Sequence, residues 1–537
     1  MSTDALSIMK QDQTAAARPR VIEKAEAHYD RVPYDSKPFP QTHPGRLAAS
    51  ARLFGLDSPP VRTARVLELG AASGGNIIPL AAEFPDGKYL GVDLSGVQVA
   101  QGKARIALHG LRNIELRHQS ITEVGEGDGL FDYIICHGVY SWVPEHVRHA
   151  ILRVCKQRLS PNGVAYVSYN VLPGWRQKQA LRDVMLLYTG GPGSPDGARR
   201  AREIMAFLET STQAGTHYGA MVRSEVARLA GLGDDYLTHE YLEDENAPCT
   251  FTEFANAAAA QGLAYMAEAE LSTMLPETVD ASAAARMREI AANQLLATEQ
   301  VIDLVTGRTF RQTMMVHAAR AGEIVRHISH LKAEPLHFIA PRGIRLTSED
   351  NGVNTFTDAF GRTLRTGSAA VRKAIEKMIE RVPSSSAMAD LCEAASKNRR
   401  GTSPEDRADI LDALFKMHIA GMLALSSEPV TAARRGAKPV AMRFAQLDAG
   451  AGLPHTVNAR HESATLDIVT QHVLPLLDGA CNDAALEAHV LERARADVIV
   501  FQRSGERVTD EAGLAACAKE HVARSLDFLA AAAMLKG

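Results

Sequence analysis

The spacing of hydrophobic and polar positions changes along the chain and divides it into regions. From residue 65 short apolar runs alternate with longer stretches of helical spacing. Buried strands are predicted at 65–69, 88–93, 114–118, 131–136 and 163–169. Ser95 can cap one of the intervening helices, and Gly110 can end it. Strands that alternate with helices predict an α/β fold whose parallel sheet is covered on both faces.

This alternation stops after Tyr169. Residues 189–198 have the composition of a loop, and 199–232 have helical patterns. A helix, a glycine and a strand follow from 251, and 308–318 contains one more strand. We therefore predict a first domain over 1–320 that carries a helical insertion over about 174–250.

Two further domains are expected after this sheet. Short strand-like pieces and a long helical run between 366 and 425 predict a winged-helix-like domain over 321–430. Residues 431–537 begin with a basic linker and continue mainly as Ala/Leu-rich helix. The apolar faces of these last helices could pack internally or join two copies, so a homodimer is one expectation.

Charge and cysteine content narrow the class of protein. There are 59 basic and 63 acidic residues, and the resulting net charge of −4 argues against a nucleic-acid partner. No apolar stretch is long enough to insert into a membrane, and the N-terminus lacks a secretory pattern. The six cysteines are scattered and have no zinc-ligand spacing. We expect a cytoplasmic protein without a metal site.

The strongest chemical signal is the segment VLELGAASGGN at 66–76. A buried strand bears Glu68 near its end, and a glycine-rich turn then opens a helix, while Asp93 ends the next strand. A carboxylate there can accept both hydroxyls of a ribose, so the pattern suits a nucleoside cofactor. NAD-binding turns need a close approach to pyrophosphate, but Ala72 replaces the middle glycine. S-adenosylmethionine carries no phosphate and is favoured.

At this point the chain resembles the class I S-adenosylmethionine-dependent methyltransferases. It is more narrowly similar to a bacterial subgroup with a methyltransferase regulatory domain, which includes rickettsial enzymes that methylate lysines of outer membrane protein B. The matching segments include YDRVPYDSKPFPQTHPGRLA, RVLELGAASGGN, FDYIICHGVYSWVP, LSPNGVAYVSYNVLPGW and RTFRQTMM. The resemblance implies a Rossmann-like seven-stranded sheet and methyl transfer from S-adenosylmethionine, which leaves S-adenosylhomocysteine.

The family pattern also implies a set of cofactor contacts. The methionine end would lie at Glu68 and Gly70, the ribose at Asp93, and the reacting methyl above His137. Ser120 departs from the pattern, because many members have an aspartate there. The full set of expected cofactor-binding residues is Glu68, Gly70, Ala71, Gly75, Asn76, Asp93, Leu94, Gln98, Ser120, Ile121, His137 and Gly138.

The resemblance implies a protein lysine as the acceptor of the methyl group, and a lysine must be neutral when it attacks. An aromatic-lined, dry channel would lower the lysine pKa and hold the side chain. The residues expected to act in catalysis are Tyr140, Asn170 and His137. Those expected to bind the substrate are Tyr29, Tyr34, His43, Trp142 and Trp175.

Other functions use the same fold, because a fold does not fix a function. A small-molecule methyltransferase would keep the cofactor site and use the distal half as a lid or for oligomerisation. An RNA methyltransferase would use the winged-helix-like part, although the charge balance disfavours it. A non-catalytic scaffold is disfavoured by the intact Glu68, Gly70 and Asp93.

Overall fold

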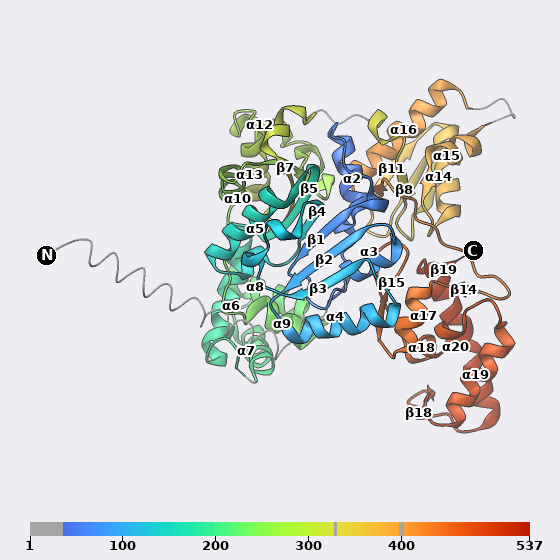
Figure 1. Cartoon of the computed structure of the whole chain (residues 1–537). Helices are drawn as coiled ribbons and strands as arrows, with labels where there is room; N and C mark the ends of the chain where they lie inside the picture. The colour runs from blue at the N-terminus through green and yellow to red at the C-terminus, as the bar shows by residue number, and fades with distance from the viewer. Residues whose placement is uncertain (1–35, 195, 327–329, 397–401, 537) are drawn as a thin grey trace.

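A seven-stranded sheet forms the centre of the molecule (Figure 1). The computed structural model describes residues 36–194, 196–326, 330–396 and 402–536. The strands are β1 (Arg65–Leu69), β2 (Lys88–Asp93), β3 (Ile114–His118), β4 (Phe131–Cys136), β5 (Leu159–Asn170), β6 (Leu263–Glu268) and β7 (Phe310–His317). They follow the order β3-β2-β1-β4-β5-β7-β6, and only β7 runs antiparallel to its neighbours. This is the class I methyltransferase sheet that the family resemblance implied.

Helices cover both faces of the sheet. They are α2 (Pro44–Leu53), α3 (Ile77–Glu83), α4 (Gly96–His109), α5 (Glu145–Arg158) and α10 (Phe251–Ala260). Successive strand residues face opposite sides, and Val66 accordingly joins one hydrophobic cluster, which includes α2 and α3 residues, while Leu67 and Leu69 join another, which includes α5 residues. Ser95 caps α4 by accepting from the Gln98 amide, and Gly110 ends it in the left-handed conformation, as predicted.

The segment between β5 and α10 is helical, as the loss of alternation predicted. It contains α6 (Trp175–Thr189), α7 (Gly197–Ser211), α8 (His217–Leu229) and α9 (Asp234–Tyr241), which enclose a hydrophobic cluster of their own. Three shorter helices, α11 (Pro276–Val279), α12 (Ala284–Ile290) and α13 (Leu295–Thr306), lie between β6 and β7. Figure 1 shows the α6–α9 insertion at one side of the sheet and the C-terminal helices at the other.

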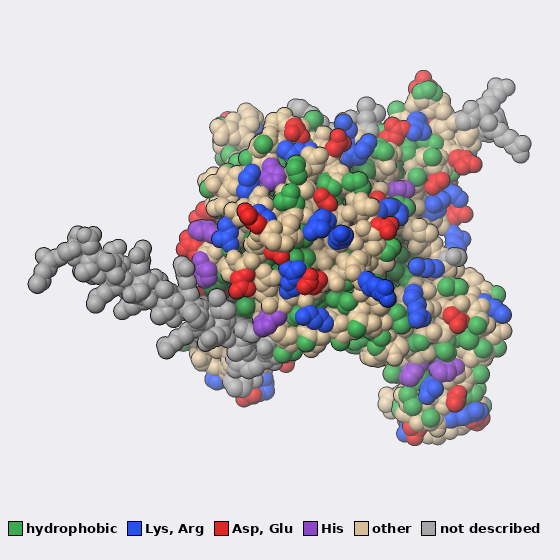
Figure 2. Space-filling model, in the orientation of Figure 1, with side chains coloured by type: hydrophobic (Ala, Val, Ile, Leu, Met, Phe, Trp, Pro, Cys, Tyr) green, Lys and Arg blue, Asp and Glu red, His purple; other side chains and the backbone are tan. Residues whose placement is uncertain are grey.

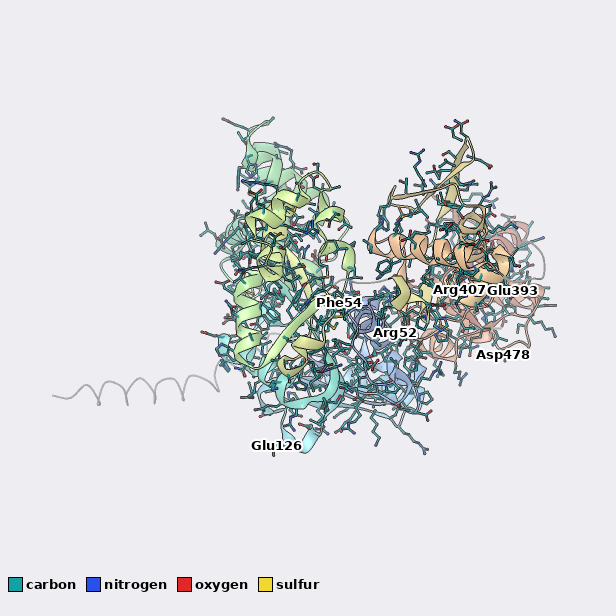
Figure 3. The ribbon with its side chains drawn as sticks, turned by 90° about the horizontal axis from the view of Figure 1, so that it is seen from above. Arg52, Phe54, Glu126, Glu393, Arg407 and Asp478 are labelled. Atoms are coloured by element: carbon teal, nitrogen blue, oxygen red, sulfur yellow. The ribbon has the colours of Figure 1, made fainter. Side chains whose placement is uncertain are left out.

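The middle region combines small sheets with three helices. Its elements are β8 (His337–Ile339), β9 (Arg345–Asp350), β10 (Val353–Thr357), β11 (Thr363–Thr366), α14 (Ala369–Arg381), β12 (Ser386–Ala387), α15 (Met388–Ala395), α16 (Pro404–Ile419) and β13 (Ala424–Ser426). The long helical run expected over 366–425 is therefore interrupted: the short strand β12 pairs with β8 between α14 and α15. Figure 3 shows Arg52 and Phe54, at the end of α2, between this region and the helices beside β7.

The C-terminal region is mainly helical. It contains β14 (Val440–Ala441), α17 (Arg443–Gly450), β15 (His455–Val457), β16 (Ser463–Thr465), α18 (Ile468–Val473), α19 (Asp483–Arg495), β17 (Gln502–Arg503), β18 (Glu506–Arg507), α20 (Glu511–Ala531) and β19 (Leu535–Lys536). Leu514, Val522 and Leu526 of α20 are buried in a cluster formed within this region. The division at 320 and 430 remains our proposal for the domain boundaries.

The surface carries charges of both signs. Figure 2 shows Lys and Arg interspersed with Asp and Glu over one face, which fits the near-balanced composition. In the described residues, no helix combines the length and apolar character that a membrane span requires. The same residues contain no group of three or more His, Cys, Asp or Glu side chains placed to hold a metal ion.

Candidate cofactor and acceptor site

The predicted cofactor residues come together at the carboxyl edge of the parallel strands. Glu68 lies near the end of β1, Asp93 ends β2, and His137 follows β4. Ser120 follows β3 and caps the short helical turn Ile121–Glu123 through its hydroxyl. Ligands of open α/β sheets bind at this edge, so the strand ends and the turns after them form the candidate site.

The glycine-rich turn is held by Asp93. Its Oδ2 accepts from the Ala72 amide at 2.7 Å, and its Oδ1 accepts from the Ser95 amide at 2.9 Å. Ala72 has φ of +49°, which is unfavourable for alanine, and the Asp93 contact holds it there. Gly70 has φ of +75°, and a Cβ at this position would lie 2.4 Å from Val139. The turn therefore needs its glycine and the aspartate.

Further predicted residues surround this turn. The amides of Gly70 and Ala71 both donate to the Val92 carbonyl, at 2.9 and 3.0 Å, which fastens the turn to the end of β2. Leu94 is half-buried, whereas Gln98 is buried and its Oε1 lacks a hydrogen-bond partner. Ile121 is also buried.

Glu68 is the most unusual group in the site. Its Oε1 accepts from Asn76 Nδ2 at 2.7 Å, whereas its Oε2 is buried without a hydrogen-bond partner. Burial raises the pKa of Glu68 to about 8. The nearby Asp93 also raises this pKa, whereas the hydrogen bond from Asn76 lowers it. Burial also raises the pKa of Asp93, although amide hydrogen bonds oppose that rise. Two neighbouring carboxyls, one buried and one half-buried, would be stabilised as anions by a cationic ligand.

An N-terminal strap, residues 36–42, crosses the glycine-rich turn. The Gly75 amide donates to Ser36 Oγ at 2.8 Å, and the Phe39 amide donates to Asn76 Oδ1 at 2.9 Å. A Cβ on Gly75 would lie 2.2 Å from the Ser36 carbonyl oxygen, so only glycine permits this crossing. The strap places Phe39 over the site.

The remaining predicted N-terminal residues are placed differently. His43 follows the strap, accepts from the Gly45 amide at 3.0 Å and so caps α2, while its Nε2 lies 3.2 Å from Glu83 Oε2. Tyr29 and Tyr34, predicted to bind the substrate, lie outside the described residues. Their role and that of His43 stay predictions.

His137 lies among aromatic side chains. Its ring centroid is 3.9 Å from that of Phe39, 5.8 Å from that of Tyr166 and 5.9 Å from that of Phe310. Its Nδ1 lies 2.9 Å from the Tyr166 hydroxyl, which donates to Gln312 Oε1 at 3.2 Å. That hydroxyl has one proton, so His137 donates from Nδ1 and keeps Nε2 as an acceptor. Burial lowers the pKa of His137 to about 3, so the ring is neutral.

The space beside His137 is open at Gly138. Gly138 is exposed and has φ of +70°, its amide donates to Ser168 Oγ at 2.8 Å, and a Cβ there would meet no atom within 4 Å. Asn170, at the end of β5, is buried, and its Nδ2 has no hydrogen-bond partner. These groups present an acceptor nitrogen and an unpaired amide at the same sheet edge.

The other predicted aromatic residues pack against neighbouring rings, and their predicted roles in catalysis and substrate binding stay predictions. Tyr140 is buried, and its ring packs against those of Tyr169 and Phe254. Trp142 and Trp175 form a T-shaped pair with centroids 6.0 Å apart; Trp175 is 1% exposed, whereas Trp142 is half-buried. Only Trp142 of this pair offers surface to a substrate.

Several residues that lie at the site were not predicted from the sequence. Ser36 and Phe39 lie before the first predicted strand and were not among the predicted site residues. Tyr166 and Phe310 lie in predicted strands, but the face of the sheet on which each lies was not assigned. Period-2 alternation could have placed Tyr166.

Family models match three parts of the chain. A methyltransferase domain matches 66–163, a predicted methyltransferase regulatory domain matches 233–317, and a PKMT C-terminal winged helix domain matches 437–534. The last match falls in the region that we predicted as mainly helical, and the winged-helix-like interpretation of 321–430 stays a prediction.

Relatives and solved structures agree with these matches. The chain is 38% identical over 228 residues to the uncharacterized protein RP028 of Rickettsia prowazekii, which is 42% of this chain and 91% of that protein. It is 42% identical over 291 residues to RP789 of the same organism, 54% of this chain and only 52% of RP789. The chain thus spans about half the length of RP789.

The structure of PKMT2 from Rickettsia typhi is similar over 94% of this chain and 100% of that one, with 27% identity and a TM-score of 0.81. Its complex with AdoHcy covers the same shares, with 28% identity and a TM-score of 0.82. The chain belongs to the class I S-adenosylmethionine-dependent methyltransferases that carry a methyltransferase regulatory domain and a PKMT-type C-terminal winged helix.

Proposed function

We propose that this methyltransferase transfers methyl groups to lysine side chains of a protein. The observation that supports the cofactor part of the proposal is the buried Glu68 carboxyl, whose Oε2 has no hydrogen-bond partner. The acceptor part rests on the similarity to PKMT2. The α-ammonium of S-adenosylmethionine would donate to Glu68 Oε2 and favour ionised Glu68. The residues present therefore fit the cofactor at its methionine end.

The rest of the site fits the nucleoside. Asp93 accepts from the Ala72 amide at Oδ2 and from the Ser95 amide at Oδ1, and the Leu94 amide also stabilises its carboxylate. A carboxylate oxygen can accept more than one hydrogen bond, so the ribose hydroxyls can use the positions that remain. Leu94, Ser120 and Ile121 follow β2 and β3 and are proposed to border the adenine.

The acceptor side suits a neutral amine. S-adenosylmethionine, when bound, supplies an electrophilic methyl group, so the chain has mainly to orient the attacking nitrogen. His137 Nε2 can accept an N–H of that amine, and its low pKa makes it an orienting group rather than a strong base. Phe39 and Phe310 beside His137 exclude water, which lowers the pKa of an entering lysine. Asn170 and Trp142 are proposed to border its path.

The similarity to PKMT2 supports a protein acceptor because it extends over nearly the whole chain. We also propose that the enzyme is cytoplasmic and does not act on nucleic acid. The six cysteines are unpaired, which fits a reducing compartment. Leu514, Val522 and Leu526 of α20 are buried within its own region, whereas Phe528 of the same helix is 38% exposed. A homodimer is therefore still a proposal, which light scattering would test.

The proposal is tested with methyl-tritiated S-adenosylmethionine and an extract of host cells. Label in base-stable, nuclease-resistant protein, and methyl-lysine after hydrolysis, is expected. The matched control is Asp93→Ala, which should give a blank. Label confined to small molecules or RNA would support methyltransferase activity but would contradict a lysine acceptor.

A further inference from the structure

The side-chain amide of Asn76 connects three parts of the chain. It follows the glycine-rich turn and is only 3% exposed. Its Nδ2 donates to Glu68 Oε1 at 2.7 Å and to Thr42 Oγ1 at 3.0 Å. Its Oδ1 lies 2.9 Å from the Phe39 amide and 2.9 Å from Nε2 of His461, 385 residues further along the chain. The C-terminal region therefore touches the cofactor turn directly.

The partners of Asn76 fix the direction of each hydrogen bond. The Phe39 amide can only donate, so the carbonyl oxygen of Asn76 must face Phe39 and its NH₂ group must face Glu68. The same carbonyl oxygen faces His461, so His461 must donate from Nε2. Burial lowers the pKa of His461 well below its ordinary value, so the ring is neutral and donates as the Nε2–H tautomer.

A rigid turn presents the imidazole. His461 lies between β15 and β16, has φ of +58° and is 2% exposed. Within this turn, Asn458 Oδ1 accepts from the amides of Arg460 and Glu462, at 2.8 and 2.9 Å. The His461 amide also donates to the Asn458 carbonyl at 3.0 Å. The hairpin thus supports the side chain from its own backbone.

We propose that His461 is a positioning residue of the cofactor site. By holding the Asn76 carbonyl, it turns the Asn76 NH₂ group toward Glu68 Oε1 and keeps Glu68 Oε2 directed at the cofactor ammonium. The C-terminal region is then part of the cofactor site, although it contributes no group that touches the cofactor. This inference rests on the cofactor-binding part of the proposed function.

Two substitutions that differ by one methylene test it. The side-chain nitrogen of Gln can take the place of His Nε2, whereas Asn tolerates a positive φ but is too short to reach Asn76. Binding of S-adenosylhomocysteine is measured by titration calorimetry. We expect His461→Asn to weaken it about five- to tenfold, the loss of one hydrogen bond, and His461→Gln to stay within about twofold of the wild type.

The control is His455→Phe in the same hairpin, where an exposed histidine forms a hydrogen bond with Thr465 away from the turn that presents His461, and it should bind as the wild type does. A double variant, Asn76→Ala with His461→Asn, should bind no more weakly than Asn76→Ala alone. In steady-state methylation, His461→Asn should raise the KM for S-adenosylmethionine and leave kcat nearly unchanged.

Each result has one meaning. Equal affinity of His461→Asn and the wild type would overturn the positioning role, as would additive losses in the double variant. A matching loss in His461→Gln would show a merely structural contribution and also overturn it. A wild-type protein that fails to bind S-adenosylhomocysteine would instead contradict the cofactor site itself.

Discussion

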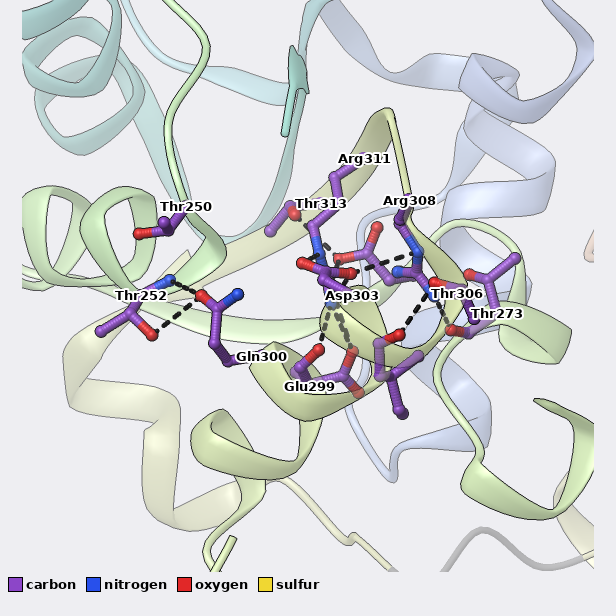
Figure 4. A network of polar contacts seen from close by, with 12 residues as sticks. Thr250, Thr252, Thr273, Glu299, Gln300, Asp303, Thr306, Arg308, Arg311 and Thr313 are labelled. Carbon is purple, nitrogen blue, oxygen red and sulfur yellow. Dashed lines mark hydrogen bonds and ion pairs between the residues drawn. The ribbon is translucent and has the colours of Figure 1, made fainter. Parts of the chain in front are cut away.

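Two buried ionic clusters in this molecule are built in opposite ways. The first, the Arg311 cluster, lies inside the sheet region and surrounds one guanidinium with the carboxylates of Glu268, Glu299 and Asp303 (Figure 4). Their distances to Arg311 are 2.8, 3.1 and 2.8 Å, and all four side chains are at most 2% exposed. Arg308, 3.3 Å from Asp303, adds a second positive charge.

The second, the Asp448 cluster, joins the C-terminal region to α4. Asp448 of α17 is fully buried and lies 2.6 Å from Arg105 Nη2 and 2.9 Å from His109 Nε2. Thr456 also donates to it, at 2.7 Å. Burial alone would raise the pKa of Asp448, but hydrogen bonds from His109 and Arg105 hold it below its usual value.

The difference lies in charge balance and in what each cluster joins. Three carboxyls outnumber two guanidiniums in the Arg311 cluster, and burial raises the pKa of Glu299 to about 8, so a proton completes the balance near neutral pH. Asp448 is satisfied as an anion. The Arg311 cluster ties β6 and β7 to α13, whereas the Asp448 cluster ties two regions together beside the His461 contact. Breaking the first should unfold the sheet, and breaking the second should mainly separate the regions.

The largest effect is expected from Arg311→Met. It leaves three buried carboxyls without their shared cation, and the free energy of unfolding should fall by about 3–5 kcal/mol. Urea denaturation measures the loss. Arg308→Met is the matched control and should cost much less, because Arg308 contacts only one of these carboxylates. A loss below about 1 kcal/mol in Arg311→Met would contradict the role of this cluster.

Asp448→Asn should lose about 1.5–3 kcal/mol, the scale of hydrogen bonds to a charged group. The loss should appear at the contact between α4 and α17, as faster amide hydrogen exchange there, while β1, β4 and β5 keep their protection. Binding of S-adenosylhomocysteine should weaken as well, because His461 is carried by the same region. Uniform loss of protection across the sheet would show that the two clusters do not differ as we infer.

The Arg311 cluster also predicts a pH effect. Glu299 binds a proton up to about pH 8 in the folded state, whereas an unfolded glutamate loses it near pH 4.3. The folded state therefore binds more protons in this window, and stability falls as pH rises from about 4.3 to 8. Glu299→Gln should remove this part of the slope and raise the melting temperature at pH 8.5 by about 2–4 °C relative to the wild type. Parallel profiles of the two proteins would refute it.

The smallest effect is expected from Thr456→Val. It removes one of the four hydrogen bonds that Asp448 accepts, and nearly isosteric packing remains. The cost should be about 0.5–1.5 kcal/mol, measured by chemical denaturation. A loss equal to that of Asp448→Asn would mean that Thr456, rather than Arg105 and His109, carries the contact.

The sequence patterns predicted local features well and distant contacts poorly. Strands β1 and β2 are short apolar runs beside a glycine turn, so their positions and the placement of Glu68 and Asp93 could be read from neighbouring residues. The family resemblance supplied the seven-stranded sheet. Periodicity alone predicted one helical run over 366–425, which was wrong because the strand β12 that interrupts it is only two residues long.

The contact between His461 and Asn76 had no signal of this kind. A hydrogen bond between residues 385 positions apart produces no recognisable pattern in the sequence, and a single histidine in a hairpin resembles any other. The Asp448 cluster was not predicted for the same reason, because Arg105 and Asp448 lie in separate helical patterns. Side-chain orientation at domain contacts depends on packing that only the folded molecule supplies.

The helical insertion α6–α9 leaves and re-enters the sheet region at one place. Val171 forms a parallel bridge with Cys249, and the Leu172 amide donates to the Cys249 carbonyl at 3.0 Å. Its helices also pack around a separate apolar core. A segment whose two ends already meet can be shortened, lengthened or exchanged without redirecting β5. This junction is therefore a place at which the insertion could be exchanged by design.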